Sequence, residues 1–182
     1  MRLAALGGVL SLAFAATACS FNPPPYASSF QNVQQARDLG HPIKVGTFAL
    51  DKPQLAKIGV RGNTLTTANG SFADYVRGAA ISELTMADRY SDSASDELVA
   101  TLLENDLDAT GMATGHGKIA ARFTLKHNGG DTFTKTISAE NSWPSSFVGA
   151  VAIPNAVNAY PGLVEKMLGQ LYSDTDFVRA LK

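Results

Sequence analysis

The sequence predicts an α+β fold: a single small mixed or antiparallel sheet of about four strands, covered on one face by two helices, in the order β-α-β-β-β-α. Several segments alternate apolar and polar residues with period two, which is typical of strands with one buried face. Other segments repeat apolar residues at helical spacing, and a glycine-rich turn joins two of the alternating segments. A layer of helices over one sheet face is the simplest way to bury both apolar surfaces.

The sequence of the first half of the domain predicts a strand followed by a helix. Residues 43–50 alternate and end at Lys52-Pro53, and a short second candidate strand lies near residues 57–61. Ser71 is a good helix N-cap, and Asp74 three residues later forms a weak capping box. The helix of residues 71–90 has its apolar stripe at Phe72, Val76, Ala80, Leu84 and Ala87.

The sequence of the second half of the domain predicts three strands and a closing helix. Residues 97–109, 118–127 and 132–139 alternate, and Asn128-Gly129-Gly130-Asp131 joins the last two as a hairpin. Residues 154–171 place apolar side chains on one helical face, with a kink or restart expected at Pro161. A last turn capped near Asp174 follows.

The N-terminus carries the sharpest signal of the chain, a single cysteine at Cys19. Arg2 precedes an uncharged apolar stretch, and the small residues Ala16-Thr17-Ala18 lead up to the cysteine. This pattern resembles the lipobox of bacterial lipoproteins, although Ala16 stands where leucine is usual. The resemblance implies a lipoprotein signal peptide at residues 1–18 and palmitate or similar acyl chains on Cys19. A plain secretory signal cut after Ala18 and an uncleaved membrane helix are the alternatives, and the stretch is short for a span.

Residues 19–40 are expected to be the lipidated cysteine and a flexible, proline-containing tether, because they include Pro23-Pro24-Pro25 and few large apolar side chains. Residues 41–182 are then a single periplasmic α+β domain. The formal net charge of −1 gives no field for binding nucleic acid, so membrane attachment would come from the lipid. Without a second cysteine, neither a disulfide nor a cysteine-based metal site can form.

The order of elements over about residues 42–182 resembles small lipoproteins of the Gram-negative envelope, similar to the YajG-type lipoproteins and the N-terminal domain of TolB. The segments that carry the resemblance include Glu104-Asn105-Asp106, residues 114–118 and Ala152-Ile153-Pro154. The resemblance implies a non-enzymatic module that assists an envelope assembly through protein contacts. Ser20 after the cysteine is compatible with sorting to the outer membrane, on its periplasmic face.

Few residues indicate a catalytic or metal-binding role. Glu104, Asp106 and Asp108 would point the same way on a strand and could approach a hard cation, but a solvated strand end explains them as well. His116 lies between two glycines in an expected loop, and a loop explains the glycines without catalysis. No nucleophile elbow or phosphate-binding loop occurs, so we expect no enzyme, no cofactor and no metal.

The connector after the hairpin is unusually apolar, from Trp143 and Phe147 to Ile153. Most of it is expected to pack on the core, but exposed aromatic residues are also typical of interfaces, so Trp143 and Phe147 are the candidate partner surface. The favoured function is a lipid-anchored binding or assembly module. A carrier of a lipid or other apolar ligand between sheet and helices, and an envelope hydrolase, are the alternatives. The partner and the oligomeric state stay open.

Overall fold

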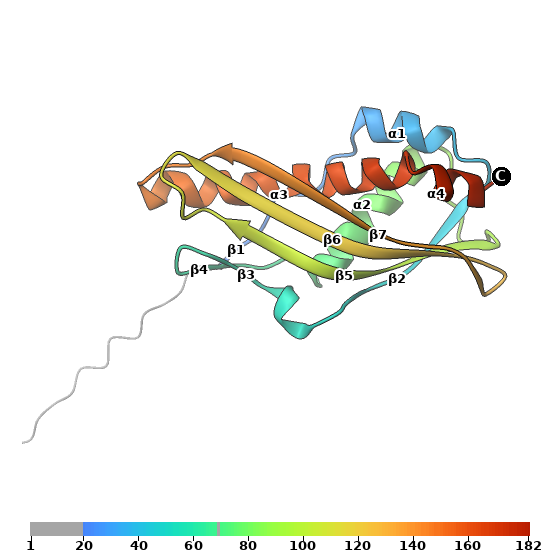
Figure 1. The fold of residues 1–182 in the computed structure, drawn as a ribbon, viewed down its shortest axis with the longest axis horizontal. Coiled ribbons are helices and arrows are strands. Elements are labelled where there is room, and N and C mark those ends of the chain that lie inside the picture. The colour runs from blue at the N-terminus through green and yellow to red at the C-terminus, as the bar shows by residue number, and fades with distance from the viewer. Residues whose placement is uncertain (1–19, 69) are drawn as a thin grey trace, which may run out of the picture.

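The structure is a computed structural model that describes residues 20–68 and 70–182, and its main sheet has four strands in the order β2-β5-β6-β7 (Figure 1). These strands are Ile43–Leu50, Asp96–Asp108, Thr114–His127 and Gly130–Pro144. β2 pairs with β5 in parallel, whereas β5, β6 and β7 form an antiparallel meander. The predicted α+β class is confirmed, including the strand and helix order of the main layer.

Helices cover one face of this sheet (Figure 1). α2 (Phe72–Met86) packs against β2, and α3 (Gly149–Tyr172) packs against β6 and β7. The predicted capping box is present, because the Ser71 side chain accepts from the Asp74 amide while the Asp74 carboxylate accepts from the Ser71 amide. α3 continues through Pro154 and Pro161, so no new helix begins at Pro161. A short α4 (Thr175–Ala180) follows, with the predicted cap at Asp174.

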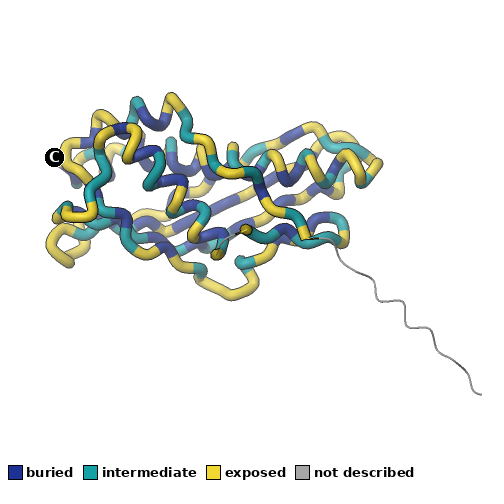
Figure 2. The backbone as a smooth tube through the Cα atoms, turned by 180° about the vertical axis from the view of Figure 1, so that it is seen from behind, coloured by how far each residue is buried: buried dark blue, intermediate teal, exposed yellow. Residues whose placement is uncertain are grey.

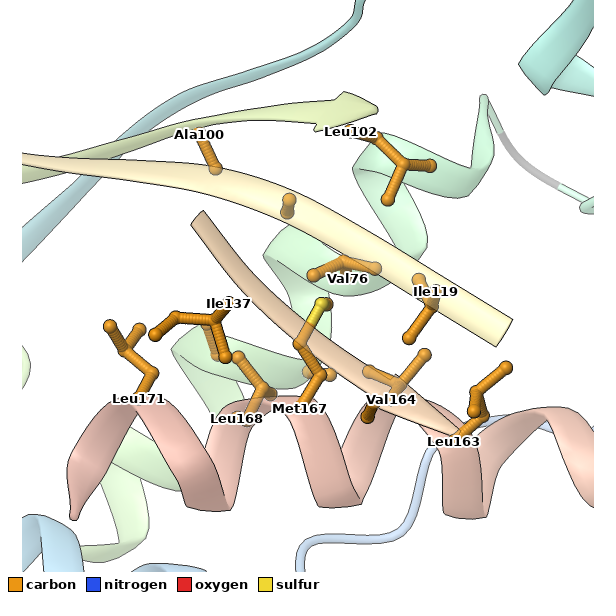
Figure 3. Packing of buried hydrophobic residues seen from close by; sticks show 14 of the residues in the cluster. Val76, Ala100, Leu102, Ile119, Ile137, Leu163, Val164, Met167, Leu168 and Leu171 are labelled. Atoms are coloured by element: carbon orange, nitrogen blue, oxygen red, sulfur yellow. The ribbon is translucent and has the colours of Figure 1, made fainter. Parts of the chain in front are cut away.

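The core lies between the sheet and the helices (Figure 3). Val76 of α2 and Met167 of α3 meet Leu102, Ile119 and Ile137 from three neighbouring strands, and all five side chains are buried. Full burial of one such side chain stabilises the fold by roughly 1.5–3 kcal/mol. The outward residues of β6 and β7 are mostly exposed, in agreement with the predicted solvated face.

A second, smaller sheet was not expected. It consists of β1 (Ser20–Phe21), β4 (Asn63–Leu65) and β3 (Ile58–Val60), in the order β1-β4-β3. β3 and β4 form a hairpin whose turn residues, Arg61 and Gly62, both have positive φ, as a tight hairpin turn requires. β1 pairs with β4 in parallel, Ser20 beside Thr64. β3 also packs against β5, which joins the small sheet to the main one.

The largest correction concerns residues 20–40, which we call the N-terminal strap. The sequence predicts a flexible tether, but the strap runs over the helical face and contains α1 (Phe30–Arg37), which packs against α2 and α3 (Figure 2). Val33, Ala36 and Leu39 are buried in the common core. Residues 20–40 therefore belong to the folded domain, whereas the predicted signal peptide and Cys19 lie outside the described residues.

Candidate functional site

Ser20, the residue next to the predicted lipidation site, is hydrogen-bonded into the fold. Its Oγ lies 2.9 Å from Oγ1 of Thr66, and the Thr66 amide donates to the carbonyl of Phe21 at 2.9 Å. Together with the pairing of Ser20 and Thr64, these bonds hold the start of the described chain against β4. A lipid on Cys19 would thus be separated from the fold by one peptide unit, about 3.8 Å between Cα atoms.

A buried carboxylate holds the strap against α2. The side chain of Glu83 is fully buried, and its Oε1 accepts from the Tyr26 hydroxyl at 2.6 Å, the Ser29 amide at 3.2 Å and Nδ2 of Asn32 at 3.0 Å. Asn32 also donates to the Glu165 carbonyl of α3 at 2.8 Å. Burial raises the pKa of Glu83 above its ordinary value, although the three donors act in the opposite direction.

The strap has further attachments on both sides of this cluster. The Tyr75 hydroxyl donates to the Pro24 carbonyl at 2.7 Å, and Nε of Arg89 donates to the Leu39 carbonyl at 2.6 Å. Burial raises the pKa of Tyr75 to about 12. Sequence reasoning missed this arrangement. The available signal was Glu83 itself, a carboxylate within the apolar stripe of a helix, which requires partners from another segment.

The two residues of the candidate partner surface lie in different environments. Trp143 is only 7 % exposed and belongs to the core, so it is not available as a contact for a partner. Phe147 is 76 % exposed, in the connection between β7 and α3. Trp143 therefore packs on the core, as expected for most of the connector, whereas Phe147 has the exposure that an interface residue needs, and its contact with a partner stays a prediction.

Trp143 also explains the glycines around His116. Thr114–His127 is one strand, so the loop expected at His116 does not exist. A Cβ on Gly115 would come within 2.5 Å of the Trp143 indole, and one on Gly117 would lie 3.1 Å from the same ring. These glycines therefore make room for the indole on the neighbouring strand, and the His116 side chain points to the exposed face.

The carboxylates of β5 show structural contacts. Glu104, Asp106 and Asp108 lie on the outer side of β5, and Glu104 forms an ion pair with Lys118 at 3.3 Å. The hydroxyl and amide of Thr110 hydrogen-bond to Asp108 and lower its pKa. Among the described residues, no cluster of histidine, cysteine or acidic side chains has the arrangement of a metal site.

Several hollows on the described surface open to solvent. One groove, of about 340 Å³, lies between the strap and α2 and is lined in part by Pro23, Pro25, Tyr26 and Tyr75. Its volume is at the lower end of the range for small-molecule pockets. Within residues 20–68 and 70–182, no helix is long and apolar enough to cross a membrane.

No family model matches the chain, and no curated protein matches its sequence. In structure it resembles protein XCC0632 from Xanthomonas campestris, of the family DUF330, with a TM-score of 0.59 and 12 % identity over 85 % of this chain and 95 % of that one. This likeness shows a shared α+β fold.

Two further structures have lower scores. A candidate lipoprotein from Caulobacter crescentus has a TM-score of 0.49 and 11 % identity, covering 82 % of this chain and 95 % of that one. A minor lipoprotein from Acinetobacter baumannii has a TM-score of 0.43 and 14 % identity, covering 73 % and 94 %. The similarity to YajG-type lipoproteins and to TolB stays a prediction from sequence.

Proposed function

We propose that this protein is a lipid-anchored, non-catalytic binding module of the bacterial envelope, held by acyl chains on Cys19 at the periplasmic face of the outer membrane. The observation that carries the proposal is the junction at Ser20. A lipobox-like segment ends at Cys19, and the next residue is already hydrogen-bonded into a folded domain. A domain attached in this way is held at the membrane surface, where it can take part in a larger envelope assembly through protein contacts.

The roles of the polar groups support a binding function rather than catalysis. Ser71 and Asp74 cap α2, and Glu83 accepts the donors that hold the strap. Asp96 lies 2.9 Å from Nδ1 of His127 and 3.5 Å from Nδ1 of His41, at the start of β5. The Ser71 hydroxyl also donates to the Asp74 carboxylate at 2.9 Å, but both groups are engaged with backbone amides as the capping box of α2, and the other two clusters connect elements of the fold.

A carrier of an apolar ligand is the second candidate, because the groove between the strap and α2 combines proline and tyrosine side chains. The groove opens to solvent, so it would hold a ligand only along one side. Mass spectrometry of the purified protein under native conditions tests this function. A co-purifying lipid whose occupancy falls in Tyr75→Ala would favour the carrier, and ligand-free protein would favour the binding module.

Two experiments test the main proposal. In cells fed a labelled fatty acid, the wild-type chain should incorporate the label and Cys19→Ser should not; label in the serine variant would contradict the anchor. In-cell crosslinking followed by mass spectrometry should then recover a defined envelope protein with the wild-type chain. Recovery of no specific protein at native expression would contradict the assembly role. Fractionation of the two membranes tests the outer-membrane location.

A further inference from the structure

Four exposed apolar side chains gather at one end of the molecule. Met112 lies in the loop between β5 and β6 and is 73 % exposed, and Phe147 and Val148 lie between β7 and α3 with 76 % and 55 % exposed. Val151, in the first turn of α3, is 48 % exposed. These loops lie together at the end of the sheet opposite the C-terminus (Figure 1). We call the four residues the apolar tip.

Hydrogen bonds that Arg61 donates hold the loops of the apolar tip together. From the β3–β4 turn, its Nη1 donates to the Phe147 carbonyl at 2.8 Å and its Nη2 to the Gly111 carbonyl at 3.2 Å, while Nε donates to the Ala109 carbonyl at 2.6 Å. A direct bond from the Ser145 amide to the Ala113 carbonyl, at 2.8 Å, adds to this connection. The exposed side chains are therefore presented by a bonded loop cluster rather than by independent loops.

The start of the described chain lies at this same end. Arg61 and Thr64 belong to one hairpin, and Ser20 pairs directly with Thr64. Figure 1 shows β4 toward the end of the molecule that lies opposite the C-terminus. Since a single peptide unit connects Ser20 to Cys19, acyl chains on that cysteine would bring the bilayer surface to the apolar tip.

The charge pattern fits contact with lipid. Residues 109–115 and 141–164, which contain the apolar tip, include no Asp, Glu, Lys, Arg or His. Charged residues are frequent at the other end of the molecule, around the β6–β7 hairpin and α4. Several of them form ion pairs there: Lys135 with Asp174 and Asp176, and Arg179 with Asp176. The charged group within this loop cluster is Arg61, whose guanidinium donates to loop carbonyls, so placing this end in the membrane interface would desolvate few charges.

We infer that the apolar tip rests in the interfacial layer of the phospholipid bilayer that holds the acyl chains of Cys19, so that the domain stands on the membrane by this end. The inference rests on the proposed lipid anchor. A single acyl chain binds a membrane only weakly and reversibly, so stable attachment takes a second contribution. Met112, Phe147, Val148 and Val151 would supply it together with further acyl chains, and would orient the charged end away from the bilayer.

The test uses the acylated protein reconstituted in vesicles of phosphatidylethanolamine and phosphatidylglycerol. Because the chain has only one cysteine, Ala113→Cys and Ala150→Cys each give a unique thiol beside the apolar tip when Cys19 is acylated. An environment-sensitive dye on these thiols should shift to shorter emission wavelength in vesicles and be quenched by brominated lipid. The same dye on Asp131→Cys, in the β6–β7 hairpin at the other end, should show neither effect.

A second set of variants tests the side chains themselves. Phe147→Asp combined with Val151→Asp should abolish the shift at Ala150→Cys, whereas Phe30→Asp, at an exposed phenylalanine on α1, should leave it unchanged. Circular dichroism checks that each variant is folded. Fatty-acid labelling of the same samples separates the two proposals: an unlabelled chain would contradict the anchor, and a labelled chain with a water-exposed dye would overturn the membrane contact. A dye that is protected only in native membranes containing other proteins would also overturn it, since the occupant would then be a protein.

Discussion

The hydrogen bonds around Glu83 predict how strongly the N-terminal strap is attached. In Glu83→Ala, the Tyr26 hydroxyl, the Ser29 amide and one Asn32 hydrogen lose their acceptor. Each lost bond costs about 1 kcal/mol, so the free energy of unfolding should fall by about 3 kcal/mol. Glu83→Gln keeps an oxygen at the position of Oε1, and its loss should be under about 1 kcal/mol.

Urea unfolding of the chain from residue 19 onward measures both variants, and hydrogen exchange locates the effect. In Glu83→Ala, the amides of α1 and of the preceding strap should exchange faster, while those of β6 change less, because the lost bonds all connect the strap to α2. The reasoning would be refuted if the alanine variant unfolded within about 1 kcal/mol of the wild type, or if glutamine cost as much as alanine.

Three further predictions follow from burial and local geometry. Gly115→Ala should lower the free energy of unfolding by roughly 1–3 kcal/mol, because the new methyl group clashes with Trp143. Gly78 is exposed on α2 with open space around it, so Gly78→Ala should raise the free energy of unfolding by about 0.5–1 kcal/mol. Thermal melts that rank the two variants in the reverse order would contradict this. Because burial holds the pKa of Glu83 above its ordinary 4.5, its contribution to stability is complete below pH 4.5 and is lost as the pH rises through the folded pKa. The stability of the wild type relative to Glu83→Gln should therefore fall with a slope of at most about 1.4 kcal/mol per pH unit, and a rise in urea titrations would oppose this sign. All five tyrosines have pKa values raised above 10, that of Tyr75 to about 12. The tyrosinate absorbance of the folded protein should therefore stay low at pH 10, and the free energy of unfolding should fall as the pH rises above 10. Tyrosine ionisation of the folded protein below pH 10 would contradict this prediction.

The main layer of the fold was predictable because its signals are local. The alternation in residues 97–109 and the glycine turn after residue 127 each specify structure within one segment, and the Ser71 cap does the same for α2. The strands of the small sheet have two or three residues, too few for a period to show. Gly115 looks like a loop residue in the sequence, because the indole that requires a glycine there belongs to Trp143 on the neighbouring strand.

The candidate site was less predictable for the same reason. Asn32 and Tyr26 look like residues of a polar linker until Glu83 is placed beside them, some fifty residues later in the chain. Proline and glutamine around them lower the apolar content, so composition favoured a tether. Phe147 was found from its apolar surroundings, but sequence could not separate it from Trp143, because burial depends on which strand lies opposite.

Under the proposed cleavage before Cys19, the hydrogen bonds at Ser20 would also impose an order on maturation. A peptidase that cuts before Cys19 must hold the residues on both sides of the bond in an extended, accessible form, and it cannot do so while Ser20 and Phe21 are paired with β4. We therefore expect acylation and cleavage to come first and the pairing of β1 to come afterward. Closure of this short strand would then be the step that turns a newly exported precursor into the finished molecule.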